Sequence, residues 1–114
     1  MVISLSASEK SEMERLILVT ALGLLESLKN NVLTIDECQN YLFSPYTQSI
    51  LEAKKIDEAV VATIEKCLFL EDYEDLLPNQ LTGYIEQLRE DILELIENRN
   101  TVANIYEVKK WLDK

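Results

Sequence analysis

The sequence predicts an all-α protein, a compact bundle of five to six helices with at most one short N-terminal β-strand. The chain has 114 residues, which is the size of one domain. It contains only two glycines and two prolines, whereas a β-sandwich or barrel needs many turn residues. Leucine, glutamate, isoleucine and lysine, which favour helices, are prominent. We therefore expect a single helical domain over residues 1–114, with an extended segment at 1–6, a helical core at 7–98 and a C-terminal helix at 99–114.

The first few residues allow two interpretations. Val2-Ile3-Ser4-Leu5 alternates apolar and polar side chains, which is the pattern of a short strand. No second strand is evident in the sequence, and a lone strand leaves its hydrogen-bonding groups open. The segment is therefore either an irregular tail or a strand that a second copy of the chain completes.

The first helix is predicted to start near Ser6 or Ser8 and to lie inside the bundle. Two serine-to-glutamate pairs, at 6–9 and 11–14, have the spacing of a capping box. Residues 16–25 are apolar nearly all round, as in a helix surrounded by others. Gly23 lowers the helix propensity, so we expect a crossing helix to approach closely there. Asn30-Asn31 should end this helix.

Three shorter helices follow, each with a recognisable start. Thr34 and Glu37 form a capping-box pattern, Ser44-Pro45 combines an N-cap with a proline at the first helical position, and Asp57 is a plausible cap. The expected inward-facing residues are, in chain order, Ile35, Cys38, Tyr41, Leu42, Tyr46, Ile50, Leu51, Val60, Val61, Ile64, Cys67 and Leu68.

Residues 70–78, LEDYEDLLP, are interpreted as a junction between helices. Leu70 should close the preceding helix, Leu76 and Leu77 should pin the turn to the core, and Pro78 should open the next helix. Asp72 or Asp75 is the expected cap of that turn, because a carboxylate is favourable near a helix N-terminus.

The clearest amphipathic pattern covers residues 79–98. Its apolar stripe is expected to consist of Leu81, Tyr84, Ile85, Leu88, Ile92, Leu95 and Ile96. A last helix is predicted over about 101–112, with Ile105, Val108, Trp111 and Leu112 facing inward.

The residue types exclude most catalytic chemistry. The chain has no histidine, which removes histidine-activated nucleophiles and histidine-ligated zinc. No glycine-rich phosphate loop or EF-hand pattern occurs. Cys38 and Cys67 are either one disulfide or, as we expect in the cytoplasm, two buried thiols. We therefore expect a non-enzymatic protein without cofactor or metal, and only carboxylate-dependent catalysis stays conceivable.

The charge is strongly negative and unevenly distributed. The net charge is −10, which disfavours nucleic acid and anionic membranes and favours encounter with a basic protein. Residues 71–97 contain nine acidic side chains and one arginine, which leaves −8. Glutamates repeat at i,i+4 on the face opposite the apolar stripe, where like charges repel. They either only solvate the helix or bind a basic partner, with Tyr73 as an aromatic anchor. The candidate partner-binding residues are Glu71, Asp72, Tyr73, Glu74, Asp75, Glu86, Glu90, Glu94 and Glu97.

Four stretches resemble a family of small bacterial proteins of unknown function, about 110 residues long. They are the segments at 12–16 (EMERL) with the leucine-rich helix after it, 34–37 (TIDE), 41–47 (YLFSPYT) and 70–78 (LEDYEDLLP). The resemblance extends to about residue 98 and leaves out residues 100–114. It implies no activity and no site residues.

The size, acidity and helix content are also similar, as a class, to immunity proteins that neutralise basic nuclease toxins. We expect a cytoplasmic protein, because no signal peptide is recognisable and the longest apolar run, Leu16 to Leu25, is too short to span a bilayer. We also expect this protein to bind a basic partner. A structural or regulatory homodimer is the alternative.

Overall fold

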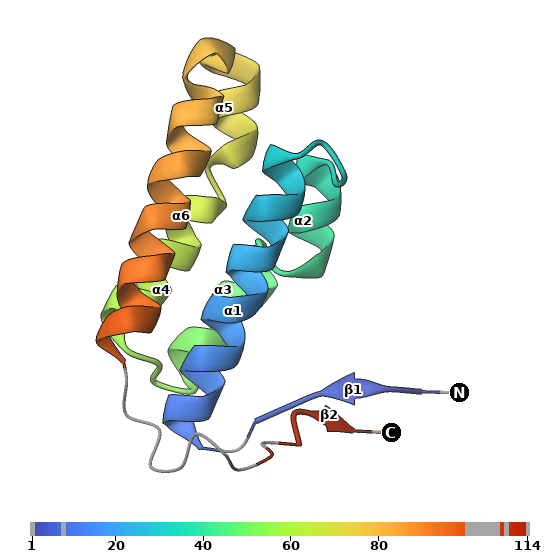
Figure 1. Ribbon diagram of the computed structural model, residues 1–114, viewed down its shortest axis with the longest axis vertical. Helices are drawn as coiled ribbons and strands as arrows, with labels where there is room; N and C mark the ends of the chain where they lie inside the picture. Colours follow the sequence, from blue (N-terminus) through green and yellow to red (C-terminus); the bar gives the residue numbers. More distant parts are fainter. Residues whose placement is uncertain (1, 8, 100–107, 109, 114) are drawn as a thin grey trace.

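A computed structural model describes residues 2–7, 9–99, 108 and 110–113 of the chain. The expected mostly helical architecture is confirmed for these residues (Figure 1). The helices are α1 (Lys10–Lys29), α2 (Ile35–Tyr41), α3 (Pro45–Ala53), α4 (Glu58–Cys67), α5 (Leu70–Leu76) and α6 (Leu81–Asn98), with a 3₁₀ turn, η1 (Pro78–Gln80), before α6. Two short strands, β1 (Ser4–Leu5) and β2 (Leu112–Asp113), complete the described elements.

The two longest helices, α1 and α6, lie side by side and run in opposite directions (Figure 1). Two ion pairs between them fix the alignment, Lys29 with Glu86 at 2.9 Å and Glu26 with Arg89 at 2.8 Å. Helix α4 packs against α6, and α3 packs against α4. Helix α5 contacts α2 and the start of α6, at the end of the molecule where α1 finishes.

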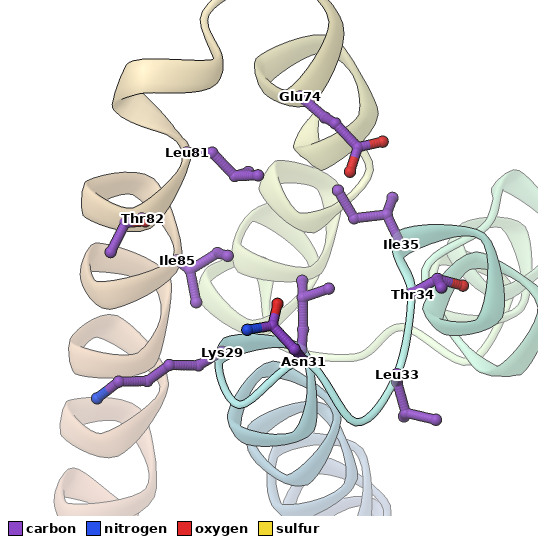
Figure 2. A pocket seen from close by; sticks show the side chains of 10 residues that line it. Lys29, Asn31, Leu33, Thr34, Ile35, Glu74, Leu81, Thr82 and Ile85 are labelled. Carbon is purple, nitrogen blue, oxygen red and sulfur yellow. The ribbon is translucent and has the colours of Figure 1, made fainter.

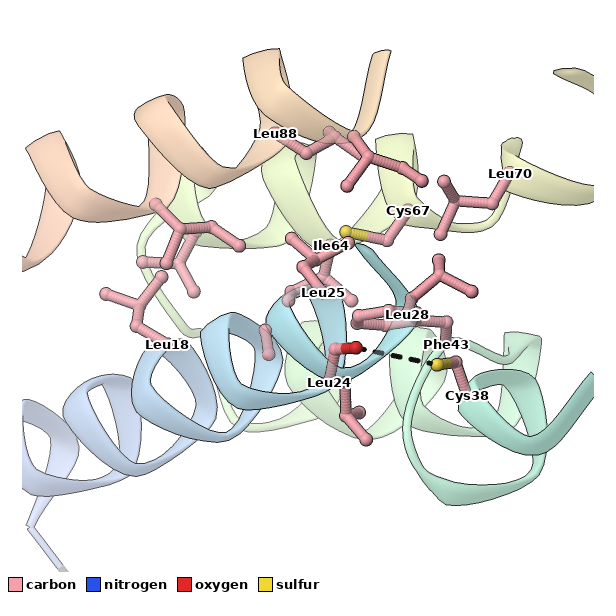
Figure 3. Close-up of a cluster of buried hydrophobic side chains, with 14 of the residues drawn as sticks. Leu18, Leu24, Leu25, Leu28, Cys38, Phe43, Ile64, Cys67, Leu70 and Leu88 are labelled. Carbon is pink, nitrogen blue, oxygen red and sulfur yellow. Dashed lines mark hydrogen bonds between the residues drawn. The ribbon is translucent and has the colours of Figure 1, made fainter. Parts of the chain in front are cut away.

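One apolar core lies between these helices (Figure 3). Its largest fully buried side chains are Phe43, Leu18, Leu25, Ile64, Leu70, Leu88 and Ile92. Cys38 and Cys67 are both buried free thiols, as expected, and the Cys38 thiol lies 3.9 Å from the carbonyl oxygen of Leu24. Burial raises the pKa of both thiols, that of Cys67 to about 12, which keeps them protonated and unreactive near neutral pH.

The predicted starts of the three middle helices are confirmed. The Thr34 hydroxyl accepts from the Glu37 N–H while the Glu37 carboxylate accepts from the Thr34 N–H, which is a complete capping box. Ser44 caps α3 ahead of Pro45, and Asp57 caps α4 through the Ala59 N–H. These caps form from residues within one turn of each other, so local sequence is sufficient to predict them.

The predicted start of the first helix is wrong. Helix α1 begins at Lys10, and its N-cap residue, Glu9, makes no side-chain cap bond. Neither serine-to-glutamate pair forms a capping box. Glu14 is instead buried, accepts a hydrogen bond from the Asp57 N–H at 2.9 Å and lies 3.6 Å from the Nε of Arg99. The start of α4, which is distant in the sequence, therefore uses the Glu14 carboxylate that the local pattern assigned to a capping box of α1. The end of α1 at Asn30-Asn31 is as expected, with Asn31 at φ 59°.

Several inward-facing predictions also need correction. Tyr41, Tyr46 and Ile50 are exposed, whereas Leu51 on the same short helix as the last two is buried. Helices of seven and nine residues bury only a narrow stripe, so side chains one position away from that stripe face solvent. No crossing helix approaches Gly23 within the described residues, since a Cβ built there would have no neighbour within 4 Å.

The N-terminal segment pairs with the C-terminal segment of the same chain. Strands β1 and β2 are antiparallel, with Ser4 opposite Asp113 and Leu5 opposite Leu112. The expected short strand therefore exists, but its partner is neither absent nor supplied by a second copy. The C-terminal helix predicted over 99–114 is wrong for the residues described, because residues 112–113 form a strand and 108, 110 and 111 have no helical assignment. Residues 100–107, including Ile105, lie outside the described residues.

Candidate functional site

The first group of predicted site residues lies on α5, which is a helix in its own right and not the turn we expected. Leu70 is buried and Tyr73 is half-buried, and this i,i+3 spacing turns one side of the helix inward. The four carboxylates occupy the other positions and are exposed. We call them the α5 surface: Glu71, Asp72, Glu74 and Asp75.

The residues that end α5 do not behave as predicted. Leu76 and Leu77 are 76% and 45% exposed, so they do not pin the chain to the core. Neither α5 nor η1 has a side-chain cap bond, so Asp72 and Asp75 do not cap a helix. Pro78 opens η1, and α6 follows at Leu81. Without a capping role, these two aspartates are left facing solvent.

An aromatic pair holds α5 in place. The rings of Tyr73 and Tyr84 are stacked, with centroids 3.9 Å apart and planes inclined by 12°. The Tyr84 hydroxyl donates a 2.6 Å hydrogen bond to the Lys66 carbonyl oxygen at the end of α4. Desolvation raises the pKa of Tyr84 to about 12. Tyr73, which we predicted as a partner anchor, therefore has one ring face covered by Tyr84. The sequence placed Tyr84 in the apolar stripe of α6 but gave no signal for its contact with Tyr73.

Most of the charge on the α5 surface is not neutralised within the described structure. Glu71 accepts a 2.9 Å hydrogen bond from the Gln39 side chain on α2. Asp72, Glu74 and Asp75 have no hydrogen bond or ion pair with a described residue. Three unpaired carboxylates on two turns of helix repel each other and attract cations.

A cleft of about 340 Å³ opens beside this surface, where the end of α1, the start of α2, α5 and the start of α6 meet (Figure 2). Its apolar lining comes from Leu28, Leu33, Ile35, Leu81 and Ile85. Its polar lining comes from Lys29, Asn31, Thr34, Glu74 and Thr82. The cleft was not predicted, because its walls come from segments more than fifty residues apart in the sequence.

The second group of predicted residues lies on α6, and one of its members has a different environment from the expected one. Glu86 was expected to point to water, yet it bonds to Lys29 and to Arg89, each at 2.9 Å. The hydrogen bond from Lys29, together with the charge of Arg89, lowers the pKa of the Glu86 carboxyl. Glu90, Glu94 and Glu97 are exposed as predicted, and we call these three the α6 stripe.

The α5 surface and the α6 stripe face different directions. Tyr84 marks the side of α6 that contacts α5. A helix turns by about 100° per residue, so the residues of the α6 stripe are rotated from Tyr84 by roughly 80–140° around the axis. The negative segment 71–97 is therefore divided over two faces, and it does not form the single surface that the sequence suggested.

Among the described residues, no group of three or more cysteine, aspartate or glutamate side chains could hold a metal ion. Within the same residues, none of the helices is both long and apolar enough to cross a bilayer. The fold and the site define a small, acidic, mostly helical protein with a negatively charged surface on α5 and a cleft beside it.

The chain belongs to the family described as Protein of unknown function (DUF3969), whose model matches residues 8–113. The resemblance noted in the sequence is thereby confirmed, but it extends further than we expected, because residues 100–113 belong to the match. Comparison with curated proteins and with solved structures gives no match.

Proposed function

We propose that the protein is a non-enzymatic binding protein that docks a basic protein partner on the α5 surface. One observation carries the proposal: three carboxylates of α5 have no partner among the described residues, and one of them, Glu74, lines a cleft whose walls are partly apolar. Stable interfaces combine an apolar centre with a polar rim, and charge complementarity accelerates encounter. A basic toxin is the partner class that fits this chemistry, and the protein would then act as an inhibitor of the immunity type.

The α5 surface is favoured over the α6 stripe for two reasons. Helix α5 is fixed to its surroundings by Leu70, by the stacked tyrosines and by the Gln39–Glu71 hydrogen bond, so its charges are preorganised. The α6 stripe has no described cleft lined by more than one of its members. Its residues would contribute long-range attraction, and Glu94 lines a small cleft between α4 and α6.

The test compares two pairs of charge reversals in capture from a lysate of the native host. Asp72→Lys with Asp75→Lys changes the α5 surface, and Glu52→Lys with Glu65→Lys makes the same change in net charge on exposed sites elsewhere. We expect a basic protein to be retained by the wild type and the control and lost by the α5 pair. Its association rate should fall at least about tenfold with added salt, as charges are screened. Equal retention by all three proteins would refute the proposal.

A structural or regulatory homodimer is a second candidate, favoured by the ribbon of β1 and β2. Leu5 and Leu112 on this ribbon, and Val2 and Ile3 just before it, are each more than 60% exposed. Two strands also leave two open edges, which readily pair with another chain. Sedimentation at micromolar concentration should then show a dimer that Ile3→Lys converts to monomer, whereas a monomeric wild type excludes this candidate.

A further inference from the structure

The β1 side of the ribbon has backbone groups that no described residue satisfies. In an antiparallel pair, residues alternate along each strand between those that bond to the neighbouring strand and those that face away from it. The Ser6 N–H donates to the Trp111 carbonyl oxygen at 2.8 Å, in the register of the ladder. Ser4 and Ser6 therefore bond toward β2, while Leu5 and, just before the strand, Ile3 turn their N–H and C=O toward the open edge.

The outer face of the ribbon is apolar. Successive side chains of a strand point to opposite faces. The Trp111 indole bonds to Glu12 at the start of α1, so the face that carries Trp111 is the one toward the bundle. Ile3, Leu5 and Leu112 point to the other face, and each is more than 60% exposed. This arrangement reverses the usual one, in which the apolar face of a sheet covers the core.

The open edge of β1 is also uncharged. Residues 2–7 (VISLSA) contain no ionisable side chain, in a chain of net charge −10. Native proteins usually blunt an edge strand with charged residues or proline, and residues 2–7 contain neither. Residues 110–113 (KWLD), which supply the other edge, include a lysine and an aspartate. The β1 edge is therefore the one without protection against pairing.

A second copy of the chain matches this edge in one register. Two antiparallel β1 strands related by a twofold axis at Ser4 place Ile3 of one copy opposite Leu5 of the other. Each of these two pairs then exchanges both of its hydrogen bonds, so four bonds form and no outward group of either residue is left over. The apolar side chains become cross-strand neighbours. Four strands also replace a two-stranded ribbon, which is barely stable alone.

The charge distribution favours a second copy over the basic partner of the α5 surface. Figure 1 shows the ribbon at the end of the bundle where α1 begins, whereas α5 lies at the opposite end. An uncharged edge gives no electrostatic attraction to a basic chain. Two copies of net charge −10 repel each other wherever their acids meet, and residues 2–7 allow an approach that brings no acids into contact.

We propose that two copies of the chain pair through the open edges of β1, antiparallel and with Ser4 on the twofold axis. Each β1 keeps its own β2 as one neighbour and gains the second copy as the other, which gives a four-stranded sheet in the order β2–β1–β1–β2. The proposal rests on the homodimer, our second candidate function, and is independent of docking at the α5 surface.

Sedimentation of the full chain at micromolar concentration tests the edge. Ile3→Pro removes an N–H that the dimer uses, and an edge strand tolerates proline where its N–H faces solvent. Val2→Pro is the matched control, because the alternation turns the Val2 N–H away from the open edge. We expect a wild-type dimer whose dissociation constant rises at least about tenfold in Ile3→Pro, since two of the four hydrogen bonds are lost. The constant should be unchanged in Val2→Pro.

Disulfide cross-linking tests the register. In the proposed dimer the two Ser4 residues form a non-hydrogen-bonded pair with Cα atoms roughly 4.5 Å apart, which a disulfide can span. The two Ile3 residues are offset by two positions along the strands, which puts their Cα atoms roughly 9 Å apart, beyond that span. Ser4→Cys should therefore give a covalent dimer under mild oxidation, and Ile3→Cys should not. The native thiols, Cys38 and Cys67, are buried.

The outcomes separate this proposal from the two candidate functions. A monomeric wild type overturns the proposal together with the homodimer, and leaves the edge to a strand of another protein. A dimer that Ile3→Pro does not weaken, or that Ser4→Cys does not cross-link, overturns the β1 edge and leaves a homodimer through another surface. Equal cross-linking by Ser4→Cys and Ile3→Cys overturns the register. Capture of a basic partner by the α5 surface is decided by its own experiment in each case.

Discussion

Glu14 is a charged residue placed among apolar neighbours on α1, and its partners explain how it is tolerated. It is 8% exposed, its Oε2 accepts from the Asp57 N–H, and its Oε1 faces Arg99. Arg99 also bonds to the Asp57 carboxylate, whose pKa is lowered first by the Ala59 N–H and further by Arg99. A buried carboxylate without such partners would be strongly destabilising. The cluster therefore joins the starts of α1 and α4 to the end of α6, and it is structural because its groups bond to each other.

At alkaline pH, two acids that the fold desolvates should weaken it. Burial raises the pKa of Tyr84 from 10.0 and that of Cys67 from 9.0, each to about 12. At a pH between the ordinary pKa and the raised pKa of each group, the unfolded chain has already lost the proton that the folded protein retains. The free energy of unfolding should therefore fall as pH rises from about 9 to 12. For Cys67, which is almost fully buried, the loss should exceed about 1 kcal/mol.

Urea unfolding at several pH values measures this loss. Tyr84→Phe and Cys67→Ala should each flatten the decline above pH 9, even though Cys67→Ala lowers the stability at neutral pH by leaving a cavity. Tyr46→Phe is the matched control, because Tyr46 is 75% exposed and should leave the slope unchanged. A wild-type slope that both core variants retain in full would contradict the assignment.

At the scale of the helix, side-chain contacts between residues close in the sequence were predictable, and contacts between distant residues were not. Thr34, Ser44 and Asp57 could be identified as caps because each bonds within three residues of itself. Glu14 could not be identified, because its partners lie 43 and 85 positions away. The same reason applies to Glu86: the pattern places it correctly on the polar face of α6, but only the antiparallel packing of α1 brings Lys29 to it.

Gly23 lowers the stability of α1, because glycine has a lower helix propensity than alanine. It is exposed, and a Cβ added there meets nothing within 4 Å. Gly23→Ala should therefore raise the free energy of unfolding by about 1 kcal/mol, because alanine restricts the unfolded chain and favours the helix. Gly83→Ala, which is equally unobstructed but lies in the first turn of α6, should gain less. Chemical unfolding of both variants provides the measurement.

A destabilising effect of Gly23→Ala would have a specific meaning. The described residues leave this position open, so a methyl group could be obstructed only by a contact outside them or by a second copy of the chain. Sedimentation of the same variant separates these cases, since only the homodimer predicts a change in mass. An increase in stability with unchanged mass agrees with the open surroundings of Gly23 among the described residues.

For the whole molecule, the division of the negative charge is the result that sequence reasoning could not reach. Seven of the nine candidate residues are exposed carboxylates, but only the four on α6 were correctly placed on a helix, since residues 71–75 were expected in a turn. Their linear order suggested one surface. The angle between α5 and the outer side of α6 depends on the stacking of Tyr73 on Tyr84 and on the α1–α6 ion pairs. The cleft depends on the same packing, because α1, α2, α5 and α6 all contribute to its walls.

The ribbon of β1 and β2 should detach from the bundle before the bundle unfolds. Its strands have two residues each, and a two-stranded ribbon is barely stable in water. The chain's single tryptophan reports on it: the Trp111 indole N–H donates to Glu12 at 3.0 Å, and the Trp111 carbonyl accepts from the Ser6 N–H at 2.8 Å. With rising urea, tryptophan fluorescence should therefore change before far-UV circular dichroism reports loss of the helices.

Glu12 provides the variants that assign this early transition. Glu12→Ala removes the acceptor of the indole N–H and should shift the fluorescence transition to lower urea while the helical transition stays in place. Glu12→Gln keeps an acceptor oxygen and should shift it less. If the two signals change together in the wild type, the ribbon and the bundle form one cooperative unit. In that case the chain ends stabilise the helices directly, and removing residues 1–6 should lower the helical transition as well.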